Sequence, residues 1–236
     1  MLLLTRSSVL LLVLKCVAGS RRILCLHGRG GSADAFLARA IAPLRDASKA
    51  TYYPVRRAKA WEYDALDSPD EDGSGSWWSY PAGQRSYSAD SYTGAEESIA
   101  AVEAALATGE FCGLLGYSQG AMLAAVVAAR AALGEADPEA TAHLRFAVIC
   151  SAALPAPYRP LLERLRANSS TTLPSSTLPT LHCLSQSDQM NPPELGEELA
   201  ACFGASAQLL WHDAGHKLPP RERLKEVAAW LDQTDV

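Results

Sequence analysis

The stretch GLLGYSQGA, residues 113–121, is an apolar run that ends in the pattern G-x-S-x-G and leads directly into an alanine-rich segment. The apolar run predicts a strand over residues 114–117. The alanine-rich segment predicts a helix over residues 121–133, ended by Gly134, because glycine is favoured just beyond a helix C-terminus. A strand followed at once by a helix is the context in which this pattern forms a sharp turn.

Ser118 lies at the tip of that turn, where its hydroxyl would project above the carboxyl edge of a sheet. The crowding there tolerates little bulk on either side, and Gly116 and Gly120 meet that demand. The backbone amide of Gln119 opens the helix and would face any oxygen that Ser118 attacks. The turn thus predicts a catalytic nucleophile and one donor of an oxyanion hole. The alternative is a turn of small residues in which the serine has no chemical role.

A glycine-rich loop, HGRGGSA at residues 27–33, follows the first strand signal, RILCLH at residues 22–27. A helix is expected after the loop, from about residue 33 to residue 46. In a hydrolase of this design such a loop supplies the second oxyanion amide, and Arg29 is the expected donor, with Gly30 next. Phosphate binding is the competing interpretation, but the pattern G-x-x-x-x-G-K-[ST] is absent.

Strand and helix signals alternate along the rest of the chain. The further predicted strands are residues 51–55, 145–150, 180–184 and 207–211. The further predicted helices are residues 91–107, capped by Ser91 or Thr93, then 193–203 and 220–232. Residues 154–179, with a short amphipathic piece, are interpreted as a surface insertion near the mouth of the site. This alternation predicts an α/β fold with a mostly parallel sheet, helices on both faces, and ligands beyond the carboxyl ends of the strands.

Three polar residues, Ser118, Asp188 and His216, each follow a predicted strand, in the chain order that α/β-hydrolases use for a catalytic triad. A serine hydroxyl is too weakly acidic to attack unaided. His216 would take its proton, and Asp188 would orient the imidazole and stabilise its charged form. Asp213 is a rival for the acid. The rivals of His216 as the base are the histidines at positions 27, 143, 182 and 212.

An aromatic segment at residues 60–92 has no clear periodicity and contains Trp77, Trp78 and Tyr80. A loop of this length in a compact domain is often functional, and these three side chains could form the wall of an apolar acyl pocket. They could equally cover the edge of the core beneath a long loop.

The composition fits one domain, expected over residues 21–236: the 236-residue chain is 48% apolar and carries a net charge of −5. No basic cluster is large enough to bind nucleic acid, and the cysteine and histidine spacings predict no metal site.

Residues 1–20 lack acids and resemble a secretory or organelle-targeting segment, too short and broken for a stable membrane span. The protein is otherwise expected in the cytoplasm. Nothing in the sequence sets the oligomeric state.

Residues 22–232 resemble the FSH-type serine hydrolases, a branch of the α/β-hydrolases. The resemblance lies in ILCLHG at residues 23–28, SWW at 76–78, GYSQGA at 116–121, the Asp188 loop that ends in proline, and GHKLP at 215–219. It implies a carboxylesterase of acyl esters that uses no cofactor, with Ser118 as nucleophile, Asp188 as acid and His216 as base. An acyl-thioesterase or lysophospholipase is the related alternative. A binding protein that has lost catalysis is the alternative from another class.

Overall fold

The computed structural model describes residues 21–52, 62–69, 75–169 and 178–234. Their framework is a six-stranded sheet in which every neighbouring pair of strands is parallel, in the order β2-β1-β3-β4-β5-β6. The strands are β1 (Arg22–Leu26), β2 (Glu62–Leu66), β3 (Gly113–Tyr117), β4 (Phe146–Cys150), β5 (Thr180–Ser185) and β6 (Ala207–His212). The predicted targeting segment, residues 1–20, lies outside the described residues.

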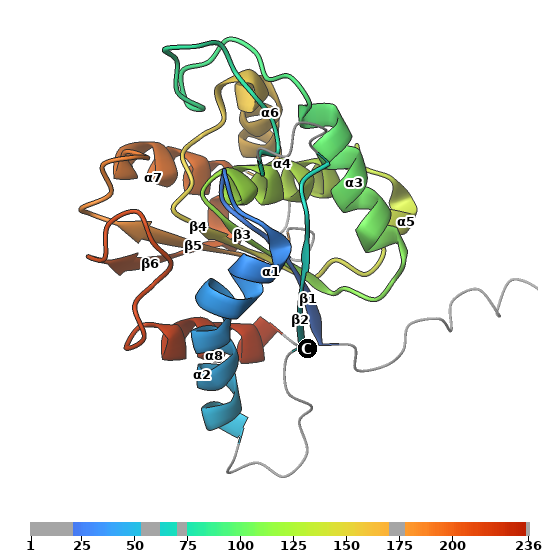
Figure 1. The fold of residues 1–236 in the computed structure, drawn as a ribbon. Coiled ribbons are helices and arrows are strands. Elements are labelled where there is room, and N and C mark those ends of the chain that lie inside the picture. Colours follow the sequence, from blue (N-terminus) through green and yellow to red (C-terminus); the bar gives the residue numbers. More distant parts are fainter. Residues whose placement is uncertain (1–20, 53–61, 70–74, 170–177, 235–236) are drawn as a thin grey trace, which may run out of the picture.

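Helices cover both faces of this sheet (Figure 1). One apolar cluster joins the sheet to α3 (Ala95–Ala107), α4 (Gln119–Leu133), α6 (Arg159–Ser169) and α7 (Pro193–Cys202). The cluster on the other face joins it to the π-helical turn Phe36–Ile41, α2 (Ala42–Tyr52) and α8 (Leu224–Thr234). The remaining helical turns are α1 (Ala33–Ala35), α5 (Pro138–Thr141), and the 3₁₀ turns Ala156–Tyr158 and Gly204–Ser206. The predicted parallel sheet with helices on both faces is confirmed.

The central helix α4 lies very close to the sheet, and small residues make that approach possible. Eleven of its residues are buried, among them all of Ala121–Ala129. A Cβ atom on Gly120 would lie 2.4 Å from the carbonyl oxygens of Leu26 and His27, at the end of β1. One on Gly116 would lie 2.4 Å from the carbonyl oxygen of Gly120. Both glycines are therefore required by the close contact between the turn and its neighbours.

The prediction of a second strand at residues 51–55 is wrong for its first two residues. Thr51 and Tyr52 form the end of α2, and residues 53–55 lie outside the described part of the chain. The second strand is β2, which pairs with β1 in the register Arg22 to Glu62. Helix formation that had already begun in the alanine-rich sequence before Thr51 outweighs the β propensity of Thr and Tyr.

Three smaller expectations also need correction. Neither Ser91 nor Thr93 caps α3: its N-cap is Gly94, at φ +87° with no side-chain hydrogen bond. Helix α8 begins at Leu224 rather than at residue 220, and residues 221–223 form a turn before it. The amphipathic piece within residues 154–179 is α6, whose buried leucines belong to the same cluster as α4, so it covers the core rather than forming a surface insertion.

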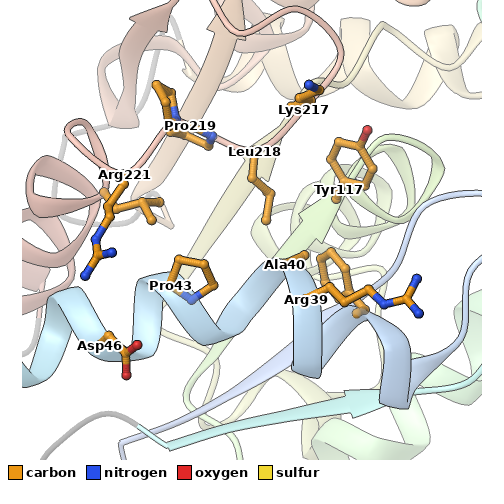
Figure 2. Close-up of a pocket in the computed structure, with 12 residues that line it drawn as sticks. Arg39, Ala40, Pro43, Asp46, Tyr117, Lys217, Leu218, Pro219 and Arg221 are labelled. Carbon is orange, nitrogen blue, oxygen red and sulfur yellow. The ribbon is translucent and has the colours of Figure 1, made fainter.

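A surface groove of about 530 Å³ lies between α2 and the segment that joins β6 to α8. In Figure 2, Leu218 and Pro219 lie on one side of it, with Ala40 and Pro43 opposite. Tyr117 lies at one end.

No described helix is both long enough and apolar enough to span a membrane.

Candidate active site

Ser118 occupies the sharp turn between β3 and α4 that the G-x-S-x-G pattern predicts. Its backbone adopts φ +54° and ψ −117°, a conformation that non-glycine residues rarely adopt. Its amide donates a hydrogen bond of 2.9 Å to the carbonyl oxygen of Cys150, at the end of the neighbouring strand β4. The strained turn is thus tied to the sheet and presents the hydroxyl at its carboxyl edge.

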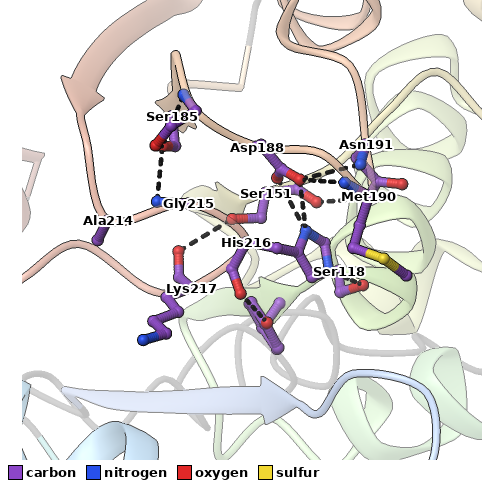
Figure 3. Close-up of polar contacts among 12 residues, drawn as sticks. Ser118, Ser151, Ser185, Asp188, Met190, Asn191, Ala214, Gly215, His216 and Lys217 are labelled. Atoms are coloured by element: carbon purple, nitrogen blue, oxygen red, sulfur yellow. Dashed lines mark hydrogen bonds and ion pairs between the residues drawn. The ribbon is translucent and has the colours of Figure 1, made fainter.

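The three predicted triad side chains form one hydrogen-bonded chain (Figure 3). The Nε2 atom of His216 lies 2.9 Å from the Oγ of Ser118. Its Nδ1 lies 2.8 Å and 3.0 Å from the two carboxylate oxygens of Asp188. With Nδ1 protonated and bonded to the carboxylate, Nε2 carries the free lone pair and can accept the serine proton.

The acid loop holds Asp188 by backbone amides. Its Oδ1 accepts hydrogen bonds from the amides of Met190 at 2.9 Å and Asn191 at 3.0 Å, and the carboxylate is 2% exposed. The side chain of Asn191 donates a 2.7 Å hydrogen bond to the carbonyl oxygen of Ser151, which follows β4. These bonds fix the carboxylate in the plane from which it meets the imidazole of His216.

The loop that carries His216 is held by hydroxyl groups from three neighbouring strand ends. Ser185 accepts a hydrogen bond from the amide of Gly215 at 3.0 Å. Ser151 donates one to the carbonyl oxygen of Lys217 at 2.9 Å, and Tyr117 donates one to the carbonyl oxygen of His216 at 2.8 Å. The sequence analysis did not single out these hydroxyls. Their position in the sequence could have indicated them, because each hydroxyl belongs either to the last residue of a predicted strand or to the residue that follows it.

Tyr117 keeps its proton in this role. Burial, with smaller contributions from Asp188 and Cys150, raises the pKa of its phenol to about 12. Its ring lies 5.4 Å from the His216 ring, centroid to centroid, and 6.3 Å from that of Phe36. Tyr117 is therefore a neutral hydrogen-bond donor and a wall beside the imidazole.

The backbone amides of Gln119 and Arg29 are the two predicted oxyanion donors. Within the described ranges, no residue accepts a hydrogen bond from either amide. The runner-up, the amide of Gly30, instead donates to the carbonyl oxygen of Gly75 at 2.8 Å. A Cβ on Gly28 would lie 3.4 Å from the Cβ of Ser118, so this loop lies directly against Ser118.

The side chain of Gln119 has a second task that the sequence did not indicate. Its Oε1 accepts from the amide of Trp77 at 3.0 Å, and its Nε2 donates to the carbonyl oxygen of Trp78 at 2.9 Å. The indole of Trp77 donates to the carbonyl oxygen of His27 at 2.8 Å. The aromatic segment thus bonds both to the first residue of α4 and to the start of the glycine-rich loop.

The three aromatic residues predicted to line an acyl pocket differ in position. Trp77 and Trp78 are 1% and 2% exposed and belong to the core, so their rings cover the core edge in this structure. Tyr80 is partly exposed and accepts a 2.9 Å hydrogen bond from the guanidinium of Arg29, which also lies over its ring. Of the three side chains, that of Tyr80 bonds to the predicted donor residue Arg29, whereas the indole of Trp77 bonds to His27 at the start of the same loop.

The rival residues lie outside the hydrogen-bonded chain. Asp213 is exposed. Its backbone carbonyl oxygen, rather than its carboxylate, accepts a 2.8 Å hydrogen bond from the hydroxyl of Ser187. His27 is buried beside Trp77, and His212 accepts from the amide of Ala214 through Nδ1. The other two rival histidines are His182, buried in β5, and His143, which precedes β4.

The fold is an α/β-hydrolase fold. It matches solved structures of α/β-hydrolases: acyl-protein thioesterase 2 of Zea mays with a TM-score of 0.62 at 20% identity, covering 92% of this chain and 94% of that one. A carboxylesterase of Bacillus cereus matches with a TM-score of 0.57 at 17% identity, covering 91% and 89%. The predicted α/β-hydrolase fold is confirmed.

Residues 17–228 match the family described as serine hydrolase (FSH1), and the chain belongs to that family. Esterase CG5412 of Drosophila melanogaster is 31% identical over 219 residues, which are 87% of this chain and 71% of that protein. Esterase OVCA2 of Danio rerio is 39% identical over 155 residues, 64% of this chain and 63% of that protein. The chain is a serine hydrolase of the esterase type, as the sequence resemblance implied.

Proposed function

We propose that this protein is a carboxylesterase that hydrolyses acyl esters through an acyl-enzyme, with Ser118 as nucleophile, His216 as general base and Asp188 as the orienting acid. The observation that carries the proposal is the continuous chain of hydrogen bonds from the Ser118 hydroxyl through both ring nitrogens of His216 to the buried carboxylate of Asp188. In each of these hydrogen bonds, the donor and the acceptor are the atoms that activation of the serine requires.

In the first half-reaction the Oγ of Ser118 attacks the ester carbonyl while its proton passes to the Nε2 of His216. The carbonyl oxygen becomes an oxyanion, which the amides of Gln119 and Arg29 stabilise. As the tetrahedral intermediate collapses, the imidazolium returns its proton to the departing alcohol. Asp188 stabilises the transient positive charge on the imidazole through the bond to Nδ1.

In the second half-reaction a water molecule replaces the alcohol. His216 accepts a proton from that water, whose oxygen attacks the acyl-serine carbonyl, and the same oxyanion site holds the developing charge. Collapse releases the carboxylic acid and returns the proton to Ser118. The six hydrogen bonds that fix the loops of Asp188 and His216 keep the two side chains in place through the cycle.

An acyl-thioesterase is the second candidate, because the same triad would cleave a thioester and one of the matching folds carries that name. Esters and thioesters with the same acyl chain separate the two. A higher kcat/KM for the thioester would favour this second candidate.

The proposal is tested by labelling the protein with a fluorophosphonate and by measuring turnover of p-nitrophenyl esters. Ser118→Ala should abolish labelling, and both Ser118→Ala and His216→Ala should lower kcat by on the order of 10⁶. His143→Ala is the matched control, because His143 precedes β4 and so lies at the opposite end of the strands from Ser118. A wild-type protein that is neither labelled nor active would refute the proposal.

A further inference from the structure

The groove between α2 and the segment after β6 lies beside the proposed triad: none of the three triad residues lines it, but the ring of its lining residue Tyr117 is 5.4 Å from that of His216. Its lining includes Tyr117, which immediately precedes Ser118, and Lys217 and Leu218, which immediately follow His216. Tyr117 is bonded to the backbone of His216 and stacks on Phe36, another lining residue. One aromatic ring therefore separates the imidazole from the groove.

The inner surface of the groove is apolar. Phe36 is 6% exposed, and Ala40, Leu218 and Pro219 complete the surface around Tyr117. A volume of about 530 Å³ is in the range of pockets that take a small organic ligand. An alkyl or aryl group seated here would bury apolar area without displacing a described side chain.

The charges around the groove are unbalanced. Arg39, Lys217 and Arg221 line it, and Asp46 is the single acid among the lining residues. All three cations are exposed, and in the described part of the chain none of them forms an ion pair or side-chain hydrogen bond. The whole chain carries a net charge of −5, so this local excess of positive charge is opposite in sign to the charge of the protein as a whole.

The two ends of the groove carry cations at different distances from the triad. In Figure 2, Arg39 and Lys217 lie towards the Tyr117 end, whereas Arg221 and Asp46 lie at the other end. An anionic group could therefore meet a cation whether the chain that carries it is short or long. Arg39 and Lys217 have no neighbouring carboxylate among the lining residues drawn at their end.

We propose that this groove binds one arm of the ester substrate, and that this arm is apolar along its length and carries an anionic group such as a carboxylate. The inference rests on the proposed esterase function and specifies the class of ester that the enzyme prefers. The apolar inner surface favours the chain, and the three cations without ion-pair partners favour the charge. The arm belongs either to the acyl part or to the alcohol part of the ester.

Matched pairs of esters test the proposal at low ionic strength. For the acyl arm, monomethyl esters of α,ω-dicarboxylic acids are compared with methyl esters of monocarboxylic acids of the same length. For the alcohol arm, acetate esters of ω-hydroxycarboxylic acids are compared with acetates of simple alcohols. The quantity measured is the ratio of kcat/KM for the anionic ester to kcat/KM for its neutral partner. Hydrolysis of each ester is monitored by the release of acid.

We expect Arg39→Gln, Lys217→Gln or Arg221→Gln to lower this ratio about twofold to fivefold for one of the two arms, the effect typical of a single exposed ion pair. About 0.5 M salt should reduce the wild-type ratio, since exposed charges are screened. Arg85→Gln is the control: it removes the same charge from an exposed residue that does not line the groove, and it should leave the ratio unchanged.

The outcomes separate this inference from the function on which it rests. A ratio that none of the three groove variants changes, in an enzyme that hydrolyses neutral esters, would overturn the subsite and leave the esterase proposal standing. An equal effect of Arg85→Gln would also overturn it, because net charge rather than the groove would then explain the preference. A wild type that hydrolyses no ester and escapes the fluorophosphonate would overturn both.

Discussion

Replacing Asp188 by asparagine changes one oxygen of the proposed triad into an amide nitrogen and keeps the shape of the side chain. The Oδ1 atom accepts hydrogen bonds from the amides of Met190 and Asn191, so the asparagine oxygen will keep that position. Its NH₂ group must then face the Nδ1 of His216, which currently lies 2.8 Å from Oδ2. Two donors cannot bond to each other at this shorter contact, so the imidazole that accepts through Nδ1 and carries its proton on Nε2 is favoured over one that keeps only the 3.0 Å bond to Oδ1.

An imidazole with its proton on Nε2 cannot accept the proton of Ser118. We therefore expect Asp188→Asn to lower kcat by about 10⁴, which corresponds to about 5 kcal/mol of transition-state stabilisation. Because the two amide bonds survive, the free energy of unfolding should change by less than about 1 kcal/mol. Activity and stability should thus separate cleanly in this variant.

Asp213→Asn is the matched control, since Asp213 lies three residues before His216 and its exposed carboxylate makes no hydrogen bond among the described residues. Its turnover should stay within about twofold of wild type. The assay is p-nitrophenyl ester turnover, with urea denaturation of both variants. A loss of less than tenfold in Asp188→Asn, or an equal loss in Asp213→Asn, would refute the assignment of Asp188.

Three further predictions concern stability and are read from denaturation midpoints. Gln119→Ala leaves the buried amide of Trp77 and carbonyl of Trp78 without partners and should cost about 2 to 4 kcal/mol; no loss would contradict a stabilising role for these two bonds. Gly120→Ala places a Cβ atom 2.4 Å from two backbone oxygens and should cost about 1 to 3 kcal/mol or more. Burial lowers the pKa of His182 to about 3, so between about pH 6.5 and 3 the unfolded chain binds a proton that the folded chain excludes. Stability should fall by about 1.4 kcal/mol per pH unit below about pH 6.5, and His182→Gln should remove that part of the slope.

The fold was predictable where strands are buried on both faces. FAVIC in β4 is buried throughout, and RILCL in β1 is buried from Ile23 onward; such strands have continuous apolar sequences. Strand β2 is EYDAL, with one buried residue, Tyr63, and pairs with β1 alone in the described sheet. A strand with one neighbour and a single buried side chain carries little apolar signal, which is why the sequence does not distinguish it from a loop.

The site was predictable to the extent that topology sets it. Parallel strands place their carboxyl ends at one edge, so residues that follow β3, β5 and β6 must lie near one another whatever the loops do. The supporting bonds could not be predicted, because most of them end on backbone atoms that every residue type shares. Asn191 bonds to the carbonyl oxygen of Ser151, and no side-chain pattern indicates that acceptor.

Two serines with positive φ link these observations. Ser118 at +54° and Ser151 at +53° are the only non-glycine residues in the described ranges with positive φ, and they follow the neighbouring strands β3 and β4. Each donates its amide to the carbonyl oxygen of the last or nearly last residue of the next strand, Cys150 for Ser118 and Cys183 for Ser151. Each such conformation costs on the order of 1 to 3 kcal/mol and persists only when surrounding contacts enforce it.

The contacts that enforce the conformation of Ser151 are also those that connect the two halves of the proposed triad. Its carbonyl oxygen accepts from Asn191 in the acid loop, and its hydroxyl donates to the carbonyl oxygen of Lys217 in the base loop. An extended backbone at this position would turn the carbonyl and the hydroxyl in other directions and break at least one of these bonds. The hydrogen bonds that hold Ser151 in this conformation therefore also fix the relative position of Asp188 and His216, and the strained turn at Ser118 presents its hydroxyl to His216.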